Sequence, residues 1–155
     1  MARFNGTFQS SAAIANNTAF LWLGYNSTVV CKLRHLNYGV LNAGGTITSE
    51  QVAIGLNVTS SGASTPVTQA LNKMDSGSQA ANNTLVTSWT TPPTLAGNDS
   101  WLIPGNDQIF MDQLWEMLSE FRIGAGASNG IAFVNRSGAA LPGGHLFAVS
   151  VEIEE

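Results

Sequence analysis

The residues best suited to catalysis or metal binding are few and widely spaced. His35 and His145 have no cysteine and no cluster of Asp or Glu beside them at metal-ligand spacing. Glu116 and Glu120 would share one face of a helix, but two solvated charges explain them better than an acid/base pair. No Gly-x-Ser-x-Gly elbow occurs, and the Gly-rich run 124–130 lacks the spacing of a dinucleotide loop. The sequence therefore predicts no catalytic residue, no metal site and no bound cofactor.

Two weaker candidates have simpler explanations. Cys31 is the only cysteine, so no internal disulfide can form, and its strand-like apolar surroundings predict a small buried hydrophobe. Asp99 or Asp107 could contribute to a calcium site, but their spacing matches no known ligand loop. We therefore expect neither a reactive thiol at Cys31 nor a calcium site at Asp99 or Asp107.

Composition indicates a single β-domain spanning residues 1–155. The chain is 44% hydrophobic but only 10% charged, against about 25% charged in average soluble domains. Asn, Ser, Thr and Gly replace the missing charges, and these residues favour turns and strand surfaces over helices. So few surface charges also suggest that partners cover part of the protein.

Charge and hydropathy argue against several classes of partner. The net charge is −4, and the six basic residues are scattered along the chain, so no nucleic-acid-binding patch is expected. No apolar stretch is long enough to span a bilayer, and the first twenty residues lack the pattern of a signal peptide. We therefore expect neither nucleic acid nor a membrane as a partner.

The clearest strand lies at the end of the sequence. From His145 to Ile153, apolar residues alternate with a second set that becomes acidic, which is the period of a half-buried strand. Residues 1–15 are either a short strand with Phe4 and Phe8 on one face or an extended arm. Further strands are expected at 20–24, 28–41, 47–59, 85–90, 99–103, 121–123 and 131–135.

The connections between these strands carry more specific predictions. Segments 28–41 and 47–59 are expected to form a hairpin, and in the second of them Val58 should point inward while Asn57 and Thr59 point outward. Residues 60–83 suggest a long surface loop with one helical turn near 67–73. Pro104 and Gly105 should form a turn.

Segment 107–121 is ambiguous. Its apolar spacing fits a short helix, with Gly124 as a stop, whereas its strand-rich surroundings favour two strands that bend near Ser119. We favour the strands. About eight to ten short strands, punctuated by Gly, Pro and Asn, predict an all-β protein with a jelly-roll or related antiparallel β-sandwich.

Aromatic residues are the candidate contact residues. Trp22, Trp89, Trp101 and Trp115 could be platforms for sugars, but no polar cluster accompanies them, so core or interface roles explain them better. His145, at the start of the last strand, fits an edge or interface position. The residues proposed for an interface are Phe4, Phe8, Trp89, Trp101 and His145.

The order of features from residue 60 to residue 155 resembles that of a known class of proteins. The features are residues 64–68 (Ser-Thr-Pro-Val-Thr), 80–82, 102–104, 110–116 with Trp115, 127–132, and a last strand that closes in Glu-Glu. This order is similar to that of small structural proteins of tailed-bacteriophage virions. The resemblance implies a jelly-roll or related sandwich that assembles as trimers on the phage head and cements neighbouring major capsid proteins. It also favours strands within 107–121.

The predicted function is therefore that of a virion structural protein. We expect a capsid decoration or cement protein that binds major capsid proteins as a homotrimer, on the capsid surface, after assembly in the host cytoplasm. The alternative is a carbohydrate- or receptor-binding module of a phage tail fibre or cell-surface protein, which would need an exposed platform such as Trp89 or Trp101. A hydrolase with an unrecognised site is the least favoured hypothesis.

Overall fold

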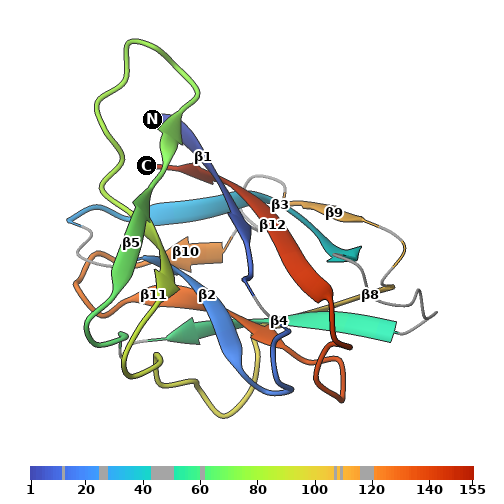
Figure 1. The fold of residues 1–155 in the computed structure, drawn as a ribbon. Coiled ribbons are helices and arrows are strands. Elements are labelled where there is room, and N and C mark those ends of the chain that lie inside the picture. The colour runs from blue at the N-terminus through green and yellow to red at the C-terminus, as the bar shows by residue number, and fades with distance from the viewer. Residues whose placement is uncertain are drawn as a thin grey trace.

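The computed structural model describes residues 1–11, 13–24, 28–42, 51–59, 62–106, 108, 110–115 and 121–155. Within these residues the chain forms twelve strands and no helix, hence no helix able to cross a membrane (Figure 1). In chain order the strands are β1 (Arg3–Gln9), β2 (Ala19–Gly24), β3 (Cys31–Asn42), β4 (Gln51–Thr59), β5 (Val67–Ala70), β6 (Asn72–Lys73), β7 (Thr84–Ser88), β8 (Trp101–Asn106), β9 (Met111–Leu114), β10 (Phe121–Ile123), β11 (Gly130–Asn135) and β12 (His145–Glu154).

The strands form two antiparallel sheets packed against each other. The first sheet has the order β10-β3-β12-β1-β6. Strand β9 also belongs to this sheet, because it pairs with β3, as β10 does. The second sheet has the order β5-β7-β2-β11-β4-β8. The predicted all-β class with an antiparallel β-sandwich is confirmed, with about twelve strands in place of eight to ten.

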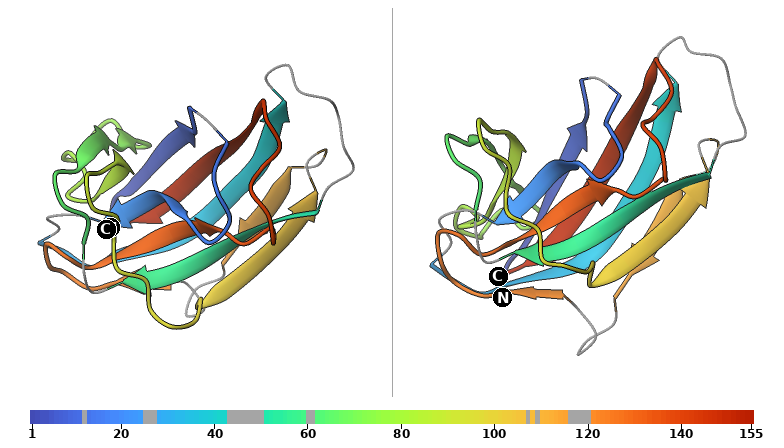
Figure 2. Two further views of the ribbon diagram at one scale, coloured as in Figure 1. Left: turned by 60° about the horizontal axis from the view of Figure 1, so that its bottom comes forward. Right: turned by 90° about the horizontal axis from the view of Figure 1, so that it is seen from below.

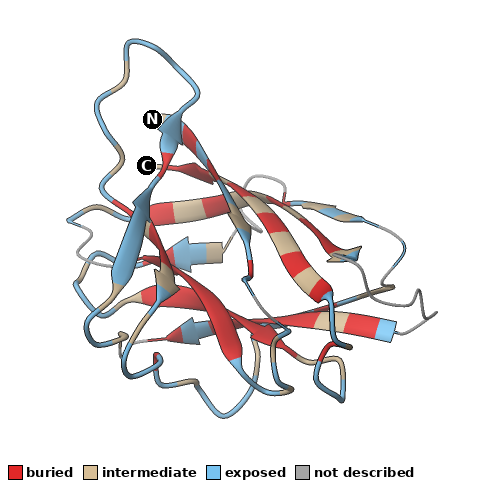
Figure 3. Cartoon of the chain, in the orientation of Figure 1, coloured by how far each residue is buried: buried red, intermediate tan, exposed pale blue. Residues whose placement is uncertain are grey.

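Strand β12 lies at the centre of the first sheet, between β3 and β1. Its residues alternate as the sequence predicts: the set from His145 to Ile153 is buried, and the intervening side chains are half-buried (Figure 3). Ten residue pairs join β12 to β3 and seven join it to β1. Strand β12 is therefore the main connection within the first sheet.

The main core lies between the two sheets. Phe20 of the second sheet stacks on Phe147 of the first, with ring centroids 4.6 Å apart. Tyr38 Oη donates a 2.8 Å hydrogen bond to the Ile103 carbonyl, which joins β3 to β8. Because these contacts cross from one sheet to the other, they fix how the layers are placed.

A second, smaller cluster covers the outer face of the second sheet. It contains Trp22, Val86 and Val134, with Trp89 and Leu95 packed against it from the segments beyond the sheet. Figure 2 shows the chain between β7 and β8 passing beside β11 and β4 before it enters β8. The second sheet is thus covered on both faces, whereas the half-buried and exposed side chains of the first sheet face outward.

Two predicted connections are wrong. The strands β3 and β4 do not form a hairpin, because they belong to different sheets. Alternation specifies which face of a strand is buried but not which strand lies beside it. The expected helical turn near 67–73 is also absent: β5 pairs with β7, and β6 pairs with β1. Residues 43–50 lie outside the described residues.

Of three other predicted segments, one is wrong, and for the other two the structure favours one of the alternatives that the sequence left open. Pro104 and Gly105 do not form a turn but lie inside β8, and β8 is an edge strand, where a missing backbone N–H is tolerated. Residues 3–9 form a strand inside the first sheet and not an extended arm. The described part of 107–121 contains β9 and the first residue of β10 and no helix, while Ser119 lies outside the described residues.

Candidate functional site

A group of apolar side chains occupies the side of the sandwich where β8 of the second sheet meets β10 of the first. We call Trp101, Phe121 and Trp115 the aromatic rim. The Phe121 ring stands edge-on to both tryptophans, with centroids 6.3 Å from Trp101 and 5.4 Å from Trp115. Trp115 is buried, but Trp101 remains 46% exposed. The rim therefore presents the exposed indole of Trp101, which packs against Phe121, and Phe121 in turn packs against the buried Trp115.

A polar network holds the chain in place just before Trp101. The Asn57 amide donates to Asp99 Oδ1 and to the carbonyls of Ala96 and Asn98, and it accepts from the Ala96 N–H. Arg136 donates to both carboxylate oxygens of Asp99, at 2.7 and 2.8 Å. This hydrogen bond from Arg136 is the largest cause of the lowered pKa of Asp99. The network fixes the entry into β8 and so the position of Trp101.

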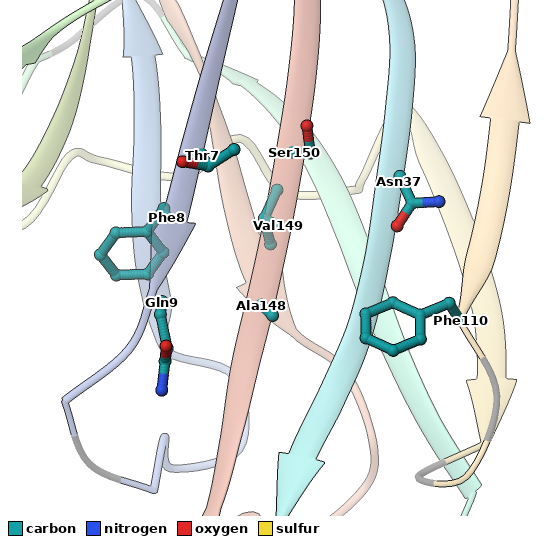
Figure 4. A pocket seen from close by; sticks show the side chains of 8 residues that line it. All are labelled: Thr7, Phe8, Gln9, Asn37, Phe110, Ala148, Val149 and Ser150. Atoms are coloured by element: carbon teal, nitrogen blue, oxygen red, sulfur yellow. The ribbon is translucent and has the colours of Figure 1, made fainter.

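The open face is the outer surface of the first sheet, formed by β1, β12, β3 and β9. At one end of it lies a shallow trough of about 280 Å³, the Phe110 trough. Figure 4 shows its lining residues, which are Thr7, Phe8, Gln9, Asn37, Phe110, Ala148, Val149 and Ser150.

Small side chains form the floor of the Phe110 trough. In register, Ser150 lies opposite both Thr7 and Asn37, so these three polar residues form one row across the sheet. In the next row Ala148 lies opposite Gly39. The Phe110 ring lies over Gly39, since a Cβ at that position would be 2.4 Å from Phe110 Cδ1. The ring can therefore sit low at the side of the trough only because residue 39 is glycine.

A cluster of charged residues lies towards the other end of the open face. Glu154 accepts two hydrogen bonds from Arg34, at 3.0 and 2.8 Å, and Lys32 Nζ lies 3.7 Å away. Burial alone would raise the pKa of Glu154, but Arg34, Lys32 and Arg3 together lower it. Each of these charges thus has an opposite charge close by.

Next to the trough, Asp112 pairs with His35. The hydrogen bond from His35 is the largest cause of the lowered pKa of Asp112. Asn37 also donates to the Asp112 carboxylate, at 3.5 Å. Pairing of β3 with β9 brings His35 and Asp112, which are 77 positions apart in the sequence, into contact.

The structure separates the five residues proposed for an interface. Trp101 is exposed on the aromatic rim. Phe8 is half-buried, stacks on Phe20 and lines the Phe110 trough. Trp89 is half-buried against the cluster outside the second sheet. Phe4 and His145 are each only 2% exposed, so both side chains are interior and are removed from the candidate surface.

Sequence reasoning missed Phe110, which is 55% exposed, and Leu114, which is 66% exposed. Both lie in the segment 107–121, whose apolar spacing alone fits a helix better than a strand. A period of two places Phe110, Asp112 and Leu114 on one face of a strand, and this alternation is the feature of the sequence that could have identified them. That this face points outward depends on the pairing of β9 with β3.

The described residues contain no group of three or more His, Cys, Asp or Glu placed to hold a metal ion. Asp99 is not available for calcium, because Arg136 and Asn57 occupy its carboxylate oxygens, and Asp107 lies outside the described residues. Cys31 is buried, as predicted, and burial followed by the charge of Glu155 raises its pKa. The candidate sites are therefore contact surfaces: the aromatic rim and the Phe110 trough.

No protein-family model, no curated protein and no solved structure matches this chain.

Proposed function

We propose that the protein is a structural virion protein, a capsid decoration protein that binds major capsid proteins as a homotrimer. The observation that carries the proposal is the aromatic rim, where Trp101 stands 46% exposed beside Phe121 at the edge of the second sheet. The resemblance of residues 60–155 to small virion proteins supplies the setting on the phage head.

The rim has the properties of a surface that another protein covers. Trp is the residue most enriched among the energetic hot spots of interfaces, and Trp101 has a packed base beneath it. Large apolar side chains grouped at one site, such as Trp101 and Phe121, mark interaction surfaces more reliably than scattered ones.

The backbone of strand β8 also supports a contact with another protein. It ends the second sheet, pairing on one side with β4. Unprotected edge strands favour association with further chains, and natural proteins usually protect them with charged side chains. Strand β8 has the sequence WLIPGN, which contains no charge. Pro104 limits pairing at one end of the strand, so we infer that contact between copies uses the end with Trp101.

The proposal is tested by measuring assembly and capsid binding together. Wild-type protein, Trp101→Ala and the control Phe110→Ala are compared by light scattering after size-exclusion chromatography. Each is then co-sedimented with expanded capsids of the source phage. We expect a wild-type trimer that sediments with capsids, loss of trimer and of sedimentation in Trp101→Ala, and wild-type behaviour in Phe110→Ala. Thermal melting checks that each variant is folded. A monomeric wild-type protein that stays in the supernatant would overturn the proposal.

The alternative predicted from the sequence, a carbohydrate- or receptor-binding module, relied on Trp89 or Trp101 as its platform. Trp89 packs against the cluster outside the second sheet, and Trp101 packs against Phe121. We therefore assign Trp101 to protein contact.

A further inference from the structure

We propose that the Phe110 trough binds a neutral saccharide. The inference goes beyond the proposed function and does not rest on it, because the trough lies on the open face of the first sheet and not on the aromatic rim.

The shape fits a small ring compound that lies flat. The trough measures about 280 Å³, close to the lower end of small-molecule sites, which begin at about 300 Å³. Its floor is low where Ala148 and Ser150 project from β12 (Figure 4). Phe110 forms one side, where its ring lies over Gly39 and is 55% exposed. A long or bulky ligand would extend beyond these contacts.

The chemistry combines one aromatic ring with several neutral hydrogen-bonding groups. A pyranose has apolar C–H faces that pack on aromatic rings and a rim of hydroxyls that need donors and acceptors. Phe110 offers the ring, and the row of Thr7, Ser150 and Asn37 offers hydroxyl and amide groups. Gln9 adds a further amide at the end of the trough. A purely apolar ligand would cover the hydroxyls of Thr7 and Ser150 without offering them a hydrogen bond, at a cost in free energy.

The charge of the trough selects among polar ligands. None of its eight lining residues is ionisable. The nearest acidic group, Asp112, is already paired with His35 and accepts from Asn37. A phosphate or a sialylated sugar would therefore find no cationic partner in the trough, and an amine would find no free carboxylate. These features favour a neutral saccharide over a charged one.

The test uses the full chain and an array of neutral glucans, mannans and galactans together with sialylated glycans. The strongest neutral ligand is then titrated by calorimetry against wild-type protein, Phe110→Ala and Gly39→Ala. The second variant keeps the aromatic ring but places a methyl group where the ring lies. Leu114→Ala is the control, because Leu114 in β9 is an exposed apolar residue close to Phe110 in the sequence but outside the trough.

We expect binding of a neutral saccharide by wild-type protein. Affinity should fall about five- to tenfold in both Phe110→Ala and Gly39→Ala, and by less than about twofold in Leu114→Ala. Absence of neutral-glycan binding, binding to sialylated glycans only, or unchanged affinity in Phe110→Ala would overturn the inference. Capsid co-sedimentation of the same variants keeps this result separate from the proposed function, because Phe110→Ala should still sediment.

Discussion

The carboxylate of Glu155 accepts hydrogen bonds from both the backbone N–H and the side-chain amide of Asn83, each at 2.8 Å. Its other oxygen accepts from the N–H and the amide of Asn82, at 2.9 and 3.2 Å. The backbone of Glu155 pairs in both directions with Ala2. One carboxylate therefore joins the segment before β7 to the place where β1 begins and β12 ends.

Glu155→Gln should destabilise the protein by about 1 to 3 kcal/mol, because an amide has one acceptor oxygen and its NH₂ group would face two donors. The measurement is urea denaturation at neutral pH. Glu152→Gln is the matched control: Glu152 makes a single 3.4 Å contact with the exposed Arg3, so its loss should cost less than about 0.5 kcal/mol. Equal shifts of the two midpoints would contradict the structural role of Glu155.

The Glu-Glu end shows how far the sequence can predict the fold. Alternation identified β12 and its buried face correctly, because a period of two depends only on local residues. The partners of Glu154 and Glu155 could not be predicted. Arg34 is 120 residues away from Glu154 and Asn83 is 72 residues away from Glu155. Such contacts depend on strand order, which local pattern does not encode.

Strand β4 shows a second limit. Asn57 and Thr59, expected to point outward into solvent, are buried, and Val58, expected inside, is exposed. The segment around Asp99 covers the outer face of the second sheet and supplies partners for Asn57. Strand β8 begins at Trp101, which pairs with Leu56, so Val58 near the end of β4 lies beyond the pairing with β8. Alternation cannot show that both faces of a sheet are covered.

The pairing of Asp99 with Arg136 predicts acid sensitivity. The folded state lowers the pKa of Asp99 below its ordinary value of about 3.9, so the pair stabilises the fold above that pH and loses its effect as the pH falls through the folded-state value. We expect the free energy of unfolding to decrease below about pH 4. Asp99→Asn should be less stable at pH 7 and should show a shallower decrease in acid. Parallel pH profiles of the two proteins would refute this.

Cys31 should be unreactive in the folded protein. Its side chain is fully buried in the core, and burial raises its pKa, so little thiolate forms even in mild alkali. A chromogenic disulfide reagent at pH 8 should react slowly with native protein and completely in concentrated guanidinium chloride. Cys31→Ala combined with Ser11→Cys places the thiol at an exposed position and should react at once. Equal native rates for the two proteins would show that Cys31 is accessible.

Of these variants, Gly130→Ala should lower the free energy of unfolding most, although it adds only one methyl group. A Cβ at Gly130 would lie 2.0 Å from Trp22 Nε1 and 2.6 Å from the Leu23 carbonyl. Trp22 Nε1 donates a buried 3.0 Å hydrogen bond to Thr59 Oγ1, so the indole cannot move without losing it.

The overpacking and the lost hydrogen bond together should cost about 2 to 4 kcal/mol in urea denaturation. Tryptophan emission should shift to longer wavelength if the indole of Trp22 leaves its site. Gly97→Ala is the control, because no atom lies within 4 Å of a Cβ at Gly97, and its effect should stay within about 0.5 kcal/mol. If both substitutions cost the same, close packing of Trp22 against β11 is not what requires glycine at position 130.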